Sequence, residues 1–177
     1  MFHWCLVWSI GNQLNLEERN KFNVFMRERC VKKVFPEEGT VYDYNYDMKK
    51  MGFVNYGEIC KFNENSLVVP TKDFISNLNL AQMLLNNNCP IIFMGPLSSG
   101  KSLLTQELIK KISENWYCQE MPFSRTTSHR NVHNLIEENM VKVQGNIFNL
   151  GNSKKAILLV EDMNMPKRDK WGDRTSE

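Results

Sequence analysis

One stretch of the chain constrains its fold more than any other: residues 90–102, which read Pro-Ile-Ile-Phe-Met-Gly-Pro-Leu-Ser-Ser-Gly-Lys-Ser. An apolar run ends at Gly95, and Gly-Lys-Ser follows at 100–102 after four intervening residues. This is the G-x4-G-K-S spacing of a phosphate-binding P-loop, which lies between a buried strand and a helix. We therefore predict a buried strand over residues 91–94 and a helix that begins near Lys101.

The residue types in this stretch suit phosphate chemistry. Gly95 and Gly100 carry no Cβ, so the backbone can fold around a phosphate with consecutive N–H groups pointing inward. Lys101 supplies a point charge to the β- and γ-phosphates, and Ser102 offers its hydroxyl to Mg²⁺. The predicted helix adds the positive end of its dipole. A chance glycine loop is the alternative, and the placement of the pattern between strand and helix disfavours it.

A second stretch supports the first. Residues 156–160 form a continuous apolar run, which predicts a parallel strand buried on both faces. The run ends in Glu161 and Asp162. Carboxylates at the carboxyl end of such a strand hold Mg²⁺ and orient the attacking water in nucleotide enzymes. The strand follows the P-loop by about sixty residues, so it is a candidate Walker B strand, and the two stretches together predict ATP or GTP.

Length, charge and cysteine content exclude several classes of protein. A chain of 177 residues makes one domain or pieces of two. Its net charge of +2 gives no support to a nucleic-acid or membrane partner. The longest apolar stretch, residues 4–8, is too short to span a bilayer, and the N-terminus lacks the features of a signal peptide. Five scattered cysteines suit reduced thiols in a cytosolic protein better than a disulfide framework or a zinc site: Cys5, Cys30, Cys60, Cys89 and Cys118.

The residues ahead of the P-loop predict two helices and a hairpin. Residues 2–10 are apolar almost throughout, which favours a buried helix or strand, and residues 17–30 have a helical period. A chain that opens inside a packed core is expected to be the end of another domain. Residues 41–47 alternate as a strand does, and residues 51–52 turn it into a second strand. One face of the first strand carries tyrosines, which we expect to cover a neighbouring domain rather than to stack on bases, since no basic groove accompanies them: Tyr42, Tyr44 and Tyr46.

The remaining segments read as helices and one short strand. Asp73 is expected to cap a helix that runs to Leu85, and residues 86–88 end that helix. Residues 120–124 are a candidate strand, and residues 131–144 a candidate amphipathic helix. The helix after the P-loop carries an apolar stripe of Leu104, Leu108 and Ile112.

Two polar groupings have plain structural interpretations. His129 and His133 lie four residues apart, but no third ligand or intervening Glu accompanies them. A solvated or packing role is therefore favoured over a metal site. Residues 167–170 read Lys-Arg-Asp-Lys, which is most simply a solvated face.

Several stretches resemble motifs of the dynein heavy chains, and they follow in order over essentially the whole chain. Residues 2–11 resemble the closing helix of the second AAA+ module, residues 35–44 the segment after it, and residues 69–73 the V-P-T-x-D motif that leads into the third module. Four further stretches resemble G-P-T-G-T-G-K-S, F-S-x-x-T-S, D-D-x-N-M-P and K-Y-G: residues 95–102, 123–128, 161–166 and 170–172.

The resemblance implies a dynein heavy chain of the axonemal type, at the junction of its second and third AAA+ modules and the first half of the third. Residues 1–34 would close the preceding module, residues 35–66 would be a linker with the hairpin, and residues 67–177 would be a partial AAA+ P-loop domain. The implied fold class is α/β, an incomplete parallel sheet with flanking helices. The implied partners are the other AAA+ modules, microtubules, and dynein intermediate and light chains, without nucleic acid or membrane. The implied location is the cytoplasm, the cytoskeleton and the ciliary axoneme.

The resemblance also implies the residues that serve ATP and Mg²⁺. Asp162 would be catalytic, and Ser102 and Glu161 would serve the metal. The residues implied to bind the nucleotide are Val69, Gly95, Pro96, Leu97, Ser98, Ser99, Gly100, Lys101, Ser102 and Leu103.

Departures from the family motifs favour binding over hydrolysis. Ser98 stands at a glycine position and strains the loop if that position needs a positive φ. Glu161 stands at the position of the magnesium-orienting aspartate, which moves the carboxylate one C–C bond, about 1.5 Å, further from the backbone. Ser76 replaces an arginine, and residues 149–152 replace a G-P-P element. The chain also ends before any sensor residue, arginine finger or lid that the family would supply.

Two other functional classes remain open from the sequence. One is a nucleotide or small-molecule kinase with Asp162 as a base, and the other is a non-enzymatic fragment that interacts through the tyrosine hairpin. The resemblance implies a sheet ordered 5-1-4-3-2, whose fourth strand would come after Glu177. Residues 91–94 and 157–160 would then lack their shared neighbour, so we expect the isolated chain to be weakly folded or aggregation-prone and its ATP site to be incomplete.

Overall fold

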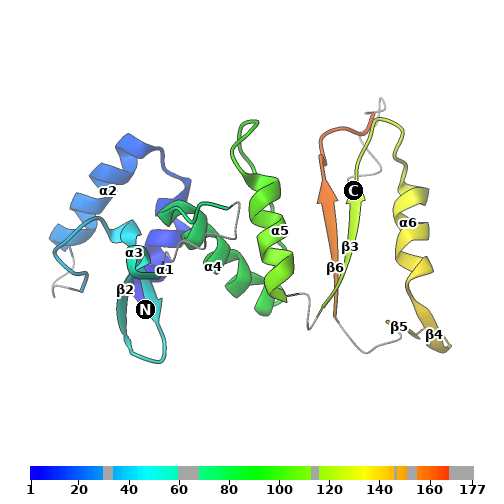
Figure 1. The fold of residues 1–177 in the computed structure, drawn as a ribbon, viewed down its shortest axis with the longest axis horizontal. Helices are drawn as coiled ribbons and strands as arrows, with labels where there is room; N and C mark the ends of the chain where they lie inside the picture. The colour runs from blue at the N-terminus through cyan, green and yellow to red at the C-terminus, as the bar shows by residue number, and fades with distance from the viewer. Residues whose placement is uncertain (30–33, 60–67, 113–115, 146, 151–154, 168–177) are drawn as a thin grey trace. The chain divides into compact units, whose positions relative to one another are not determined.

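The computed structural model describes residues 1–29, 34–59, 68–112, 116–145, 147–150 and 155–167. The chain divides into two compact units, Met1–Leu104 and Thr105–Glu177. Figure 1 shows helices and strands interspersed along the chain, with a parallel pair of strands in the second unit. This is an α/β fold with a parallel sheet and flanking helices, as the sequence predicts for a partial P-loop domain.

The first unit opens with α1 (Phe2–Ser9), a short 3-10 turn η1 (Gly11–Gln13) and α2 (Leu16–Arg29). Reciprocal hydrogen bonds start α2: Glu18 N–H donates to Asn15 Oδ1 (2.9 Å) and Asn15 N–H to Glu18 Oε2 (3.1 Å). Only one face of α1 is buried, which corrects the expectation of a wholly buried segment. Because a helix turns about 100° per residue, Trp4, Val7 and Trp8 share the buried face while Phe2 stays 73% exposed.

The predicted hairpin is present, with a later start. Its strands are β1 (Tyr44–Asp47) and β2 (Gly52–Asn55), which pair antiparallel with Tyr46 opposite Phe53. The three residues before β1 form a 3-10 turn, η2 (Val41–Asp43), rather than strand, because Thr40 and Asp43 cap one another there. A short helix, α3 (Tyr56–Ile59), follows β2.

The helix α4 (Lys72–Asn86) leads toward the P-loop. Its cap is Thr71, whose Oγ1 accepts from Phe74 N–H (3.2 Å), so the prediction of Asp73 as the cap is wrong. The predicted end is confirmed: Asn88 takes a positive φ of 57°, and Cys89 N–H donates to Leu84 O (3.0 Å).

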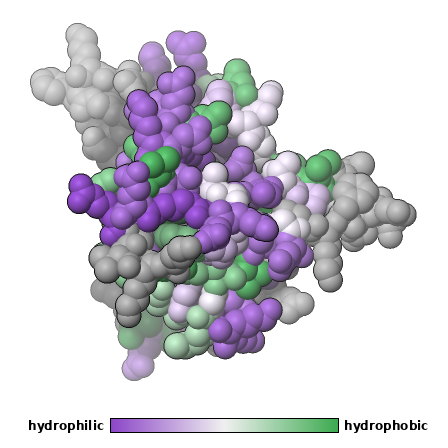
Figure 2. Space-filling model, turned by 90° about the vertical axis from the view of Figure 1, so that its left-hand side faces the viewer, coloured by the Kyte–Doolittle hydropathy of each residue, from purple (hydrophilic) through white to green (hydrophobic). Residues whose placement is uncertain are grey.

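One core holds the first unit together. It joins the N-terminal helices and the hairpin to α4: Trp4, Val7, Trp8, Met26, Phe35, Val41, Tyr56 and Ile75. Tyr42 and Tyr56 meet the Trp8 ring edge to face, and Tyr44 is 4% exposed. The tyrosines thus cover their own unit and are no open platform for bases. The face in Figure 2 is largely hydrophilic, with apolar side chains scattered among polar ones.

The second unit contains a parallel pair and a small hairpin. The pair is β3 (Trp116–Pro122) and β6 (Lys155–Glu161), and it includes Cys118 opposite Ile157. Between them lie α6 (His129–Glu138), β4 (Val141–Gln144) and β5 (Ile147–Asn149). The helix α5 (Lys101–Ile112) crosses the boundary between the units, and its stripe of Leu104, Leu108 and Ile112 is buried as predicted.

Two predictions for this unit need correction. The strand predicted at 120–124 begins earlier, at Trp116, and ends at Pro122. The helix predicted over 131–144 ends at Glu138, because the residues after it pair as β4 and β5 around Gly145, whose φ is +57°. Among the described residues, no helix is long and apolar enough to cross a membrane.

The two strands predicted around the site also differ from expectation. Residues 91–94 are not hydrogen-bonded as a strand, and Ile92 and Met94 are 73% and 89% exposed. A strand needs a neighbour for its N–H and C=O groups, and within the described ranges none pairs with this segment. The strand β6 pairs with β3 on one edge and is not buried on both faces, since Leu158 is 38% exposed.

Candidate functional site

The P-loop is a tight turn that leads directly into α5. Two of its residues have left-handed backbone conformations: Ser98 with φ 59° and Gly100 with φ 82°. Glycine adopts this region without strain, whereas a serine there costs free energy. The strain foreseen for Ser98 is therefore present. The first helical bond of α5 follows at once, from Leu104 N–H to Gly100 O (2.9 Å).

The side chain of Lys101 folds back over this loop. Its ammonium group donates to the carbonyl oxygens of Gly95 (3.0 Å) and Pro96 (2.7 Å) and to Ser99 Oγ (3.3 Å). These acceptors all belong to the loop, so the loop holds the charge close to its own backbone. A phosphate bound here would replace one or more of them as the acceptor for the Lys101 ammonium. That charge is held at the N-terminus of α5, where an anion is favoured by the helix dipole.

Gly95 has a steric reason in addition to the motif. A Cβ placed on it would lie 3.2 Å from Ser99 Oγ and 4.0 Å from Lys101 Cδ. That approach to Ser99 is tighter than ordinary van der Waals contact, so a side chain at Gly95 would push against the group that holds Lys101.

The other predicted nucleotide contacts are open to solvent. Leu97 is 94% exposed, Val69 65% and Leu103 40%. The remaining predicted residues of the loop are also exposed: Pro96, Ser98, Ser99, Gly100 and Ser102. The structure thus brings the residues of 95–103 together as one exposed turn, and the next residue, Leu104 of the apolar stripe of α5, is buried.

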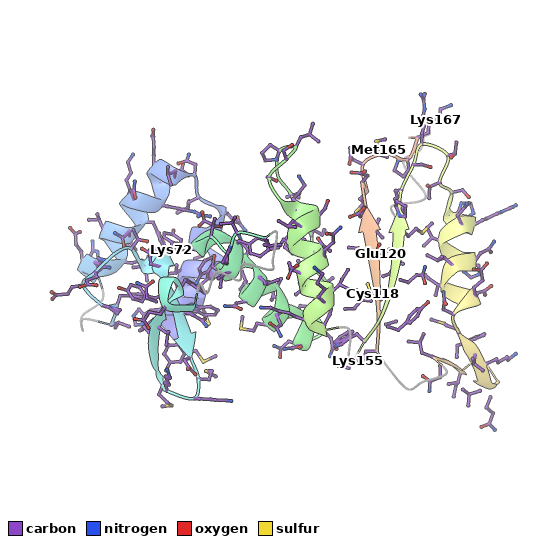
Figure 3. The ribbon with its side chains drawn as sticks, in the orientation of Figure 1. Lys72, Cys118, Glu120, Lys155, Met165 and Lys167 are labelled. Atoms are coloured by element: carbon purple, nitrogen blue, oxygen red, sulfur yellow. The ribbon has the colours of Figure 1, made fainter. Side chains whose placement is uncertain are left out.

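The two acidic residues lie at the carboxyl end of β6. Glu161 is its last residue and lies opposite Pro122 of β3, and its carbonyl oxygen accepts from Phe123 N–H (2.9 Å). Asp162 then takes a positive φ of 53° and starts a turn closed by Met165 N–H (2.9 Å). Figure 3 shows Met165 just beyond the end of this strand. Both carboxylates are exposed.

Hydroxyl groups accompany the acids at this end of the sheet, and no role was predicted for them. Ser124 N–H donates to Thr127 Oγ1 (2.8 Å), and the hydroxyls of Ser124 and Thr126 lie 3.1 Å apart. The carboxyl ends of parallel strands meet at one edge, so this cluster borders the end of β6. The signal in the sequence is the run Ser-Arg-Thr-Thr-Ser at 124–128.

The second histidine of the pair contacts a carboxylate of its own helix. His133 Nε2 lies 3.2 Å from Glu137 Oε1, one turn along α6. In the part of the chain that the structure describes, no group of three His, Cys, Asp or Glu side chains is placed to hold a metal ion. Of the basic cluster at 167–170, only Lys167 is described, and it is exposed.

A G-x4-G-K-S turn at the start of α5 and an acid pair that ends a parallel strand define a P-loop protein of the α/β class. The chain belongs to the P-loop containing dynein motor region family, which matches residues 55–176. The dynein heavy chain AAA lid domain matches residues 1–58. The resemblance read from the sequence is thereby confirmed.

Individual relatives agree with the family match. The chain is 30% identical to dynein axonemal heavy chain 12 of Homo sapiens over an alignment of 201 residues. This alignment covers 97% of the chain and 6% of the relative. It is 28% identical over 202 residues to dynein axonemal heavy chain 3 of Mus musculus, with coverages of 97% and 5%. The chain therefore spans only a small part of the length of these relatives.

Proposed function

We propose that this chain is an ATP-binding AAA+ segment of an axonemal-type dynein heavy chain, at the junction of the second and third modules. Residues 1–34 would close the preceding module, residues 35–66 would be a linker, and residues 67–177 would be part of the P-loop domain. In this proposal the segment belongs to a microtubule motor and works with the other AAA+ modules and with intermediate and light chains. Its place would be the cytoskeleton of the ciliary axoneme, in agreement with the names of the relatives.

The observation that carries the proposal is the position of Lys101. Its charge is held by Gly95 and Pro96 inside a turn whose next residues begin a helix. A phosphate at this turn would meet the Lys101 ammonium, the N–H groups of the loop and the positive end of α5 together. Binding of the phosphates alone accounts for the residue types of this loop.

The residue types suit Mg-ATP. Gly95 and Gly100 carry no Cβ at the loop, and in this proposal Ser102 of the first unit and Glu161 of the second would each offer an oxygen of the kind that Mg²⁺ prefers. ATP with Mg²⁺ would supply the phosphoryl group and neutralise its charge. Val69 and Leu103 would contact the nucleotide with the loop, and Asp162 would orient water.

We further propose a regulatory site with little turnover. Glu161 places its carboxylate about 1.5 Å further from the strand than an aspartate would, which would disturb a water-bridged contact to Mg²⁺. The longer side chain at Glu161 would change the coordination of the metal more than the binding of phosphate, because phosphate binding depends on the loop.

Titration of a protein that contains the complete module with a fluorescent ATP analogue, in the presence of Mg²⁺, tests the proposal. Lys101→Ala should weaken binding by about ten-fold or more, because a charge-assisted hydrogen bond is lost. Lys110→Ala is the matched control, since it removes a lysine of the same helix that pairs with Glu107 (2.6 Å) on the surface. Equal affinity of Lys101→Ala and the parent chain would show that the loop is not the binding site.

A further inference from the structure

The N-terminal segment, which matches the lid family, packs against the helix that leads to the P-loop. Residues 1–58 and residues 55–176 match two different families, yet they share one core within the first unit. Ile75 of α4 is part of that core, and Phe74 packs against it. The helix α4 is thus built onto the N-terminal segment.

An ion pair adds a polar contact at the beginning of α4. Lys72 Nζ lies 2.9 Å from Asp43 Oδ1, and the two side chains are 54% and 18% exposed. Lys72 is the first residue of α4 and follows Thr71, the cap of the helix. The stretch that ends at Thr71, residues 69–71, contains Val69, which the proposed function assigns to the nucleotide.

Thr40 also holds the Asp43 carboxylate, independently of Lys72. Its Oδ2 accepts from Thr40 N–H (2.7 Å) and from Thr40 Oγ1 (2.9 Å). Burial acts to raise the pKa of Asp43, but the Thr40 amide, Lys72 and the Thr40 hydroxyl outweigh it, so the pKa lies below its ordinary value. The carboxylate is therefore held in its charged form.

The loop around Asp43 is itself anchored to α2. Arg27 donates to the carbonyl oxygens of Pro36 and Gly39 (2.9 Å each), and Asn23 Oδ1 accepts from Val41 N–H (2.9 Å). Gly39 has a φ of 67°, and a Cβ on it would lie 2.7 Å from Asp43 Oδ2. The backbone can approach the carboxylate this closely only because glycine is present.

We propose that Asp43 is a positioning residue for the nucleotide site. Through Lys72 it holds the first turn of α4, and with it residues 69–71, in a fixed relation to the N-terminal segment. The nucleotide part of this inference rests on the proposed function, whereas the contact between Asp43 and α4 does not.

Hydrogen exchange in the 177-residue chain tests the contact itself. The probes are the amides of Phe74 and Ile75, which donate to Thr71 Oγ1 (3.2 Å) and Thr71 O (3.0 Å). Lys72→Met keeps the aliphatic stem and removes the charge, and it should speed exchange at both amides by about two- to five-fold. Asp43→Asn should do the same, and adding Lys72→Met to Asp43→Asn should speed exchange no further. Lys110→Met, the control in α5, should leave both probes unchanged. Unaltered exchange in Lys72→Met overturns the proposal.

Binding of a fluorescent ATP analogue with Mg²⁺ tests the link to the site. Lys72→Met should raise Kd by about two- to five-fold while Lys110→Met leaves it unchanged. Faster exchange without a change in Kd overturns the positioning role. If a parent protein that contains the complete module binds no analogue at all, the proposed function fails, and the exchange measurement still decides whether Asp43 holds α4.

Discussion

The side-chain nitrogen of Lys101 lies 2.7 Å from the carbonyl oxygen of Pro96, five residues earlier in the same loop. The carbonyl oxygen of Gly95 and the hydroxyl of Ser99 complete the contact. The charge of the loop is therefore placed by its own backbone. The backbone strain of the loop is concentrated at Ser98, whose φ is 59°.

Ser98→Gly should stabilise the first unit. A left-handed backbone costs a non-glycine residue about 1–2 kcal/mol, and the entropy of the added glycine offsets part of the gain, so we expect a net increase of about 0.5–1 kcal/mol in the free energy of unfolding. Urea unfolding followed by tryptophan fluorescence measures it. Ser99→Gly is the control: Ser99 has no positive φ and loses its contact with Lys101, so its stability should not rise. A fall in stability for Ser98→Gly would contradict the account of strain.

The acid pair predicts nucleotide binding with little turnover. Glu161→Asp should raise phosphate release from ATP, because it returns the carboxylate to the reach of an aspartate. The measurement is steady-state phosphate release in a protein that contains the complete module.

The control for this prediction uses the next residue. Asp162 has a φ of 53°, a region that asparagine tolerates, so Asp162→Asn removes the charge with little backbone strain. It should abolish any turnover gained in Glu161→Asp. The prediction would be contradicted if the parent chain hydrolysed ATP steadily and Asp162→Asn abolished that hydrolysis.

The sequence predicts the P-loop well because its glycines and Lys101 make mostly local contacts. The bonds from Lys101 to Gly95 and Pro96 span only six and five residues, so the motif specifies them without the rest of the fold. The end of α4 is predictable for the same reason, since Asn88 satisfies the last carbonyls of its own helix.

The errors arise where local patterns compete with tertiary contacts. The apolar residues over 131–144 repeat with a helical period as far as Val143, which predicts one helix. In the structure the residues after Glu138 instead pair as β4 with β5. The ion pair of Asp43 with Lys72 spans 29 residues and has no signal in the sequence. The burial expected of residues 91–94 likewise depends on a neighbouring strand, which local composition cannot supply.

Acid should weaken the first unit through Asp43. The pKa of this carboxyl is lower in the folded chain than its ordinary value of 3.8, so its contribution to stability is present above that value and is lost as the pH falls through the folded pKa. Urea unfolding between pH 6 and about pH 2.5 should show part of the acid loss removed in Asp43→Asn. Lys72→Met should remove a smaller part, because Thr40 still donates to the carboxylate. An identical pH dependence in Asp43→Asn and the parent chain would contradict the assignment.

Two tyrosines that contact the same tryptophan should differ in how the loss of the hydroxyl changes stability. Tyr42 and Tyr56 both meet the Trp8 ring edge to face, with ring centroids 6.2 Å apart in each pair. The Tyr42 hydroxyl donates to Gly11 O (3.0 Å), so Tyr42→Phe should lower the free energy of unfolding by about 1 kcal/mol.

The Tyr56 hydroxyl is buried and finds no hydrogen-bond partner among the described residues, and burial raises its pKa. The indole N–H of Trp4 beside it donates to the carbonyl oxygen of Tyr44 instead (3.1 Å). A buried hydroxyl without a partner carries its cost of desolvation uncompensated, so Tyr56→Phe should leave stability unchanged or raise it by up to about 1 kcal/mol. Urea unfolding of the two variants side by side measures the difference, and the shared Trp8 contact makes each the control for the other. A loss in Tyr56→Phe as large as that in Tyr42→Phe would mean that the Tyr56 hydroxyl has a hydrogen-bond partner in solution.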